Sequence, residues 1–166
     1  AVDLGDEPMP EDVQHVRNLA CQDAGIGDLS GLEHFRGLQT LSLWENDVED
    51  LAPLAGLTEL TWLQLGNNRI DDLAPLAGLT KMERLGLSVN EIDDLGALAD
   101  LEQLRWLNLD RNRITDDDLD VLCGLPTMRW LTLEHNAIED LSAIDCQLDE
   151  GCDVYYEFQD DESERS

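Results

Sequence analysis

A nine-residue motif that ends in asparagine recurs at a nearly constant interval, and this repeat constrains the fold more than any other feature. Successive asparagines are 22 residues apart three times and then 24 apart: Asn46, Asn68, Asn90, Asn112 and Asn136. The stretch around Cys21 fits one period earlier, with cysteine in a leucine position and Ala24 in the asparagine position. One such coil cannot bury its apolar face alone, so neighbouring coils must stack. We therefore predict a solenoid of about six coils over residues 16–144.

Each coil follows the pattern LxxLxLxxNxIxxLxxLxxL. The LxL part predicts a short strand with leucines directed inward and the intervening residues outward. The asparagine is expected in a tight bend, where its amide can satisfy backbone groups of neighbouring coils and form a ladder. The second half, as in EDLAPLAGL, is too short and too rich in Pro and Gly for a long helix. It predicts extended chain or single 3₁₀ turns whose leucines close the core from the other side.

The sequence resembles the leucine-rich-repeat family, and within it the bacterial internalin-like branch. The resemblance is carried by the 22-residue period, by the DLAPLAGLT segments at 50–58 and 72–80, and by LACQDAGIGDLSGLEHF at 19–35. It covers about residues 16–144 and implies an α/β solenoid, right-handed, with a parallel β-sheet on the concave face. It also implies a binding role, usually toward a protein. The long helical cap and the immunoglobulin-like module of many internalins are not found, so an adhesin role does not carry over.

The ends of the chain and one coil depart from the repeat. Residues 1–15 are predicted to form a lead-in and cap, with a short helix over residues 10–15. Residues 145–158 are expected to form a C-terminal cap, in which VYYEF at 154–158 is a strand that covers the last open edge. Residues 159–166 are predicted to be a disordered acidic tail. The coil after Asn112 has two extra residues, and Thr115 followed by Asp118 is typical of a helix start. We predict a short α-helix over residues 116–123.

Charge excludes several functions. Acidic residues number 38 against 10 basic ones, giving a formal net charge of −28 and a pI of about 4.1. Nucleic acid is not expected as a partner, because phosphate binding needs a basic stripe. Insertion into a membrane is not expected either, since no apolar run approaches the ~20 residues of a span. The acidic skin itself suits solubility or a salty habitat.

The predicted strands differ in charge from the rest of the chain. Within the seven-residue window at each strand, five basic and five acidic residues balance, so the whole net charge lies elsewhere. All four tryptophans fall at outward positions of this window, and Arg84 shares a column with three of them. Exposed Trp beside Arg is typical of binding hot spots, although the same residues could stack on each other and only cover the sheet. The predicted binding residues are Trp44, Trp62, Arg84, Trp106, Trp130, Arg105, Arg129, His135, Asn108 and Gln64.

Paired acidic residues precede a leucine in successive coils, as in Asp71-Asp72 and Asp93-Asp94. Columns of carboxylates could bind calcium. The favoured interpretation is that one aspartate of each pair caps the next turn and the other is solvated. No EF-hand loop or glycine–aspartate nonapeptide is present in the sequence, and no metal or other cofactor is expected.

The four cysteines support two predictions. Cys21 and Cys123 stand at leucine and alanine positions of the repeat, so both are expected to be buried apolar fillers too far apart to bridge. Cys146 and Cys152 enclose QLDEG, and a disulfide between them could pin the C-terminal cap. Such a bond would favour an exported or cell-envelope protein.

Catalysis is not predicted. The histidines are scattered, and no nucleophile motif, phosphate-binding loop or metal motif occurs in the sequence. The sequence therefore favours a noncatalytic recognition module that binds a protein through its concave, Trp- and Arg-bearing sheet. Two alternatives stay open: a glycan-binding module that uses the same Trp row, and a structural scaffold with no dedicated ligand.

Overall fold

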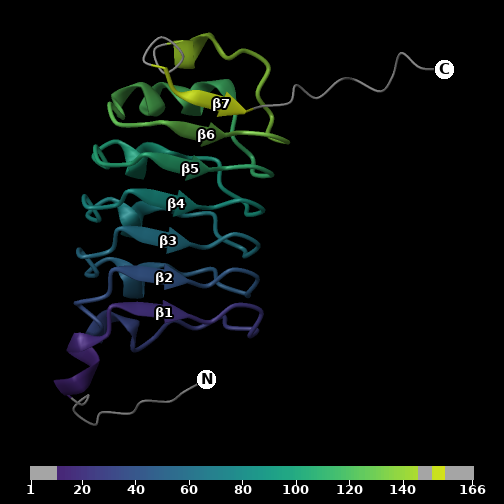
Figure 1. Ribbon diagram of the computed structural model, residues 1–166. Coiled ribbons are helices and arrows are strands. Elements are labelled where there is room, and N and C mark those ends of the chain that lie inside the picture. Colours follow the sequence, from purple (N-terminus) through teal and green to yellow (C-terminus); the bar gives the residue numbers. More distant parts are fainter. Residues whose placement is uncertain (1–10, 146–150, 156–166) are drawn as a thin grey trace.

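The computed structural model describes residues 11–145 and 151–155, and its strands form one parallel sheet in sequence order (Figure 1). The sheet consists of β1 (Asn18–Ala20), β2 (Thr40–Ser42), β3 (Trp62–Gln64), β4 (Arg84–Gly86), β5 (Trp106–Asn108), β6 (Trp130–Thr132) and β7 (Asp153–Tyr155). Each of β1 to β6 belongs to one coil of the repeat, and the coils stack from the N-terminal end to the C-terminal end. The predicted leucine-rich-repeat solenoid is confirmed.

Short 3₁₀ helices cover the other side of the stack. They are η1 (Glu11–His15), η2 (Leu32–His34), η3 (Ala52–Leu54), η4 (Ala74–Leu76), η5 (Gly96–Leu98), η6 (Asp116–Gly124) and η7 (Ser142–Ile144). Proline stands within the first turn of η3 and of η4, where its missing N–H costs nothing. With only one turn between two buried leucines, each coil returns to the sheet within its 22 residues.

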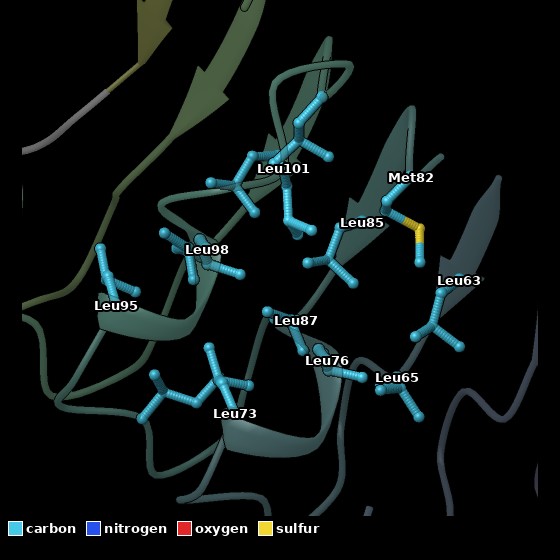
Figure 2. Close-up of a cluster of buried hydrophobic side chains, with 14 of the residues drawn as sticks. Leu63, Leu65, Leu73, Leu76, Met82, Leu85, Leu87, Leu95, Leu98 and Leu101 are labelled. Carbon is cyan, nitrogen blue, oxygen red and sulfur yellow. The ribbon is translucent and has the colours of Figure 1, made fainter. Parts of the chain in front are cut away.

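The core is a column of leucines between the sheet and the 3₁₀ turns (Figure 2). Leu63, Leu65, Leu85 and Leu87 enter it from β3, β4 and the residues that follow, and Leu76 enters from η4, all with no exposed surface. Because every coil supplies leucines to its neighbours, the coils are stable only as a stack.

The asparagine ladder of the sequence prediction is present. Asn68 shows its geometry: Nδ2 donates to the carbonyls of Leu65 (2.9 Å) and of Leu43 in the preceding coil (3.0 Å), while Oδ1 accepts the N–H of Val48 (3.0 Å). The equivalent bonds recur at Asn46, Asn90, Asn112 and Asn136. Each amide therefore joins two coils through backbone groups that the bend leaves unpaired.

One aspartate per coil caps the turn that follows it, as the capping interpretation predicted. Asp50, Asp72, Asp94 and Asp140 each accept, through Oδ1, the backbone N–H two residues later, at 2.7 to 2.8 Å. At Asp140 the hydroxyl of Ser142 also donates to the carboxylate. The two hydrogen bonds from Ser142 lower the pKa of Asp140 below its ordinary value, that of the backbone N–H contributing most.

The ends and the long coil agree with the prediction in position but not always in type. The predicted helix at 116–123 is wrong in kind, because η6 is a 3₁₀ helix over Asp116–Gly124. Its start is as expected: both the N–H and the hydroxyl of Thr115 lie 2.8 Å from Oδ2 of Asp118. The capping helix before the first coil is the 3₁₀ helix η1, and β7 adds to β6 in parallel, covering the edge of the last coil. Residues 1–10 and 156–166 lie outside the described residues.

The cysteine predictions need correction. Cys21 is exposed, because it lies in the first coil and no further coil covers that end of the stack. Cys123 is exposed and disulfide-bonded, since its position in the repeat, like that of Ala55 and Ala99, is on the surface of the turn. Cys152 is buried and free, contrary to the predicted bond with Cys146, which lies outside the described residues. Burial raises the pKa of the Cys152 thiol above its ordinary value.

Within the described part of the chain, the search for a helix long and apolar enough to cross a membrane finds none.

Candidate functional site

The outward-facing side chains of the seven strands form a continuous surface, which we call the strand face. Its first column, at the first residue of each strand, runs Asn18, Thr40, Trp62, Arg84, Trp106, Trp130 and Asp153, each in register with the next. The second column, two residues further, runs Ala20, Ser42, Gln64, Gly86, Asn108, Thr132 and Tyr155. All of the predicted binding residues except Trp44 and His135 lie in or directly before these columns on β3 to β6, and those two lie beyond the ends of β2 and β6.

The tryptophans are less exposed than their outward positions predicted. Trp130 exposes 37% of its surface, whereas Trp44, Trp62 and Trp106 are half-buried. For Trp44 the cause is Gly66 in the next coil, over which the indole ring lies. The neighbouring coil thus supplies a glycine where the ring needs space, and the ring covers part of the strand face.

An aromatic pair at the C-terminal end of the strand face was not predicted. Trp130 on β6 stacks on Tyr155 of β7, with ring centroids 4.5 Å apart and an interplanar angle of 28°. Tyr155 is 43% exposed, so the pair presents both rings to solvent. The sequence indicated a strand here, but Tyr155 follows no repeat, and its register with Thr132 had no signal in the sequence.

The arginines of the strand face differ from the other cations of the chain in their ion pairs. Cations outside the strand columns pair with a carboxylate one coil away: Arg69 with Asp47, Lys81 with Glu59 and Arg113 with Glu91. In the described residues Arg84, Arg105 and Arg111 form no ion pair. Arg129 donates from Nη1 to the carbonyl oxygen of Met128 at 2.7 Å. The positive charge of the strand face is therefore largely left to solvent or a partner.

The predicted polar residues are partly engaged inside the solenoid. Gln64 lies over Gly86, and its Oε1 is buried without a hydrogen-bond partner in the described structure. Asn108 accepts the N–H of Asp110 with Oδ1 at 3.0 Å. His135 is exposed and stands at a positive φ of 58°, where the chain turns away from the sheet. Among these three, Asn108 keeps its amide N–H groups on the face, and Gln64 acts mainly as a spacer over a glycine.

A shallow hollow of about 230 Å³ lies on the opposite side, between the turns η4 and η5. Asp71, Asp72 and Asp94 contribute its acidic lining. However, Asp72 and Asp94 already accept backbone N–H groups of their own turns. No cluster of potential metal ligands occurs among residues 11–145 and 151–155, and the strand face is the better candidate site.

Comparison with known proteins gives a family match over the middle of the chain. The leucine-rich-repeat family model matches residues 58–114 and 93–138. None of the functionally curated proteins gives a significant sequence match.

Solved structures extend this likeness to nearly the whole chain. An internalin, InlF of Listeria monocytogenes, shares 32% identity over 81% of this chain with a TM-score of 0.75, and this chain spans 39% of its length. Internalin C2 of the same organism shares 25% identity with a TM-score of 0.61, over 88% of this chain and 83% of its own. A leucine-rich-repeat protein of Leptospira interrogans, 23% identical with a TM-score of 0.77, shows the shared fold over 87% of this chain and 38% of its own.

Proposed function

The chain is an internalin-like leucine-rich-repeat protein, and from this premise we propose that it is a noncatalytic recognition module that binds a protein through the strand face. Proteins of this family commonly mediate protein interaction. The observation that carries the proposal is the pairing of uncompensated arginines with tryptophans on one face of a chain whose net charge is −28.

Two properties of the strand face support a protein ligand. Trp and Arg are the residue types most enriched at the energetic centres of protein interfaces. Trp106 and Trp130 are in register on adjacent strands, with Arg84 on the other side of Trp106. Apolar surface and unpaired guanidinium groups thus alternate along one column, which suits a partner with both apolar and carboxylate side chains.

Glycan binding through stacked rings is the alternative. Sugars need flat, accessible aromatic faces, and of the four tryptophans Trp130 alone reaches the exposure of a surface residue. Trp62 and Trp106 are half-buried, so the row offers an extended polysaccharide less ring surface than its sequence pattern suggested. This geometry favours the protein ligand.

The test is affinity capture from an extract of the source organism, with the wild-type chain and a Trp106→Ala/Trp130→Ala variant as baits. A matched control is Pro53→Ala/Pro75→Ala, which alters half-buried residues on the 3₁₀ side. Loss of a tryptophan anchor typically costs about 2 kcal/mol or more, close to a 30-fold loss of affinity. We expect a protein to be retained by the wild type and by the proline control, and lost by the tryptophan variant.

Circular dichroism and thermal melting of each bait show whether the variants remain folded. Treating the extract with a protease should abolish capture if the ligand is a protein, whereas glycosidase treatment should not. A partner bound equally by the tryptophan variant, or one that survives protease and is lost with glycosidase, would contradict the proposal.

A further inference from the structure

Three arginines surround Trp106 and Trp130 on the strand face. Arg84 is in register beside Trp106, Arg105 directly precedes Trp106, and Arg129 directly precedes Trp130. All three are exposed. We call them the arginine cluster.

The arginine cluster lacks the ion pairs that the same repeat spacing forms elsewhere. Lys81 Nζ lies 2.8 Å from Oε1 of Glu59, 22 residues earlier, and Arg69 and Arg113 are bonded to carboxylates at the same spacing. Glu83 and Arg105 are also 22 residues apart and lie on neighbouring coils, where the N–H of Arg105 donates to the carbonyl of Glu83. Their side chains nevertheless form no ion pair in the described structure.

The local charge of this region is opposite in sign to that of the whole chain. The carboxylates nearest in sequence or register are Glu83, beside Arg84, and Asp153, in register with Trp130. Three guanidinium groups therefore face two carboxylates, in a chain of net charge −28. With so many carboxylates available, cations left unpaired on the face that carries the tryptophans are in position to bind carboxylates of another molecule.

We propose that the partner presents an acidic peptide segment to the arginine cluster, with an apolar side chain against Trp106 and Trp130. This inference rests on the proposed function. The planar guanidinium group binds a carboxylate through two parallel hydrogen bonds, which Arg84 and Arg105 are free to form. A second copy of this chain does not suit the site, because two chains of −28 repel each other. At ~0.15 M salt the Debye length is about 8 Å, so distant carboxylates of the solenoid are screened while contact pairs are not.

The experiment uses arrays of synthetic peptides of equal length and equal aromatic content, which differ only in carrying Asp/Glu, Asn/Gln or Lys/Arg at the remaining positions. The wild-type chain should bind the Asp/Glu set about tenfold more tightly than the Asn/Gln set. Arg84→Gln/Arg105→Gln should remove this preference. Arg69→Gln/Arg113→Gln makes the same change of charge at cations that are already paired, and it should leave the preference intact.

A charge-reversal variant, Arg84→Glu/Arg105→Glu, should shift the preference to the Lys/Arg set. Equal or weaker binding of Asp/Glu peptides than Asn/Gln peptides by the wild type, no binding to any set, or the same loss in the Arg69/Arg113 control would overturn the acidic-peptide inference. Capture that depends on Trp106 and Trp130 but shows no preference for acidic peptides would leave the proposed function standing and remove this inference alone.

Discussion

The indole ring of Trp44 lies directly over Gly66 of the next coil, so closely that a Cβ at Gly66 would overlap Cζ3 and Cε3 of the ring. The same substitution would also bring the Cβ within 2.9 Å of the Ser88 hydroxyl oxygen. Gly66 is itself buried, so the ring can make room only by leaving its place over the backbone. Space on the strand face is thus set by the residue one coil away.

Gly66→Ala should therefore destabilise the protein by about 1–3 kcal/mol, the usual cost of an overpacked site. Trp44 should become more exposed, with a red-shifted emission that is read against a Trp44→Phe background. Gly56→Ala is the matched control, because a Cβ there meets nothing within 4 Å and the residue has no positive φ. Equal melting temperatures for the two alanine variants would contradict this account.

Adjacent asparagines offer a sharp test of the ladder. Asn68→Asp replaces the amide donor, so the carbonyls of Leu43 and Leu65 lose their partner and face a carboxylate instead. We expect a loss of about 3 kcal/mol in the free energy of unfolding, measured by urea denaturation at pH 7. Asn67→Asp changes charge identically at a position whose side chain forms no ladder bond and whose φ of 57° Asp tolerates. Similar losses in both variants would show that added charge, rather than the ladder, controls stability.

Backbone strain is concentrated at the residue before the ladder asparagine. Asp23, Glu45, Asn67, Val89, Arg111 and His135 all have positive φ there, and Val89, with φ 57°, is the one β-branched member. The left-handed conformation costs a β-branched residue about 1–2 kcal/mol more than it costs Asn. Val89→Asn should thus raise the free energy of unfolding by about 1 kcal/mol, and the reverse change, Asn67→Val, should lower it by a similar amount. A neutral or destabilising Val89→Asn would refute the strain.

Salt should stabilise the fold. The ion pairs are exposed and contribute little, so screening them removes little. Self-repulsion at a net charge of −28 is the larger effect, and it weakens as the Debye length falls to about 3 Å near 1 M salt. We expect the melting temperature to rise by several degrees between ~0.05 M and ~1 M sodium chloride. A flat or falling melting temperature would show that repulsion does not limit stability.

The repeat made the coils, the ladder and the register of the strand face predictable. The 22-residue period by itself places Trp62, Arg84 and Trp106 in one column, because identical coils stack in register. Features outside the period were not predictable in this way. The stacking of Tyr155 on Trp130 depends on how β7 pairs with β6, and the exposure of Cys123 depends on where the turn surface lies.

Some of the missed features had a signal in the sequence. Gly66 and Gly86 stand one coil after Trp44 and Gln64, at the same position of the repeat, and both glycines receive the earlier side chain. A glycine that follows a large residue by one period therefore indicates a side chain lying flat on the sheet. The tryptophan row was predicted to be more exposed because the alternation within one strand does not reveal this relation between coils.

The most direct test of the central claim is oxidative footprinting of the wild-type chain with and without its captured partner. Trp130 and Tyr155 are the most exposed aromatic residues of the strand face, at 37% and 43%. If this face is the binding surface, the partner should protect both side chains from hydroxyl radicals, while Pro53 and Pro75 on the 3₁₀ side keep their reactivity. Unchanged oxidation of Trp130 and Tyr155, with protection on the 3₁₀ side instead, would contradict the account.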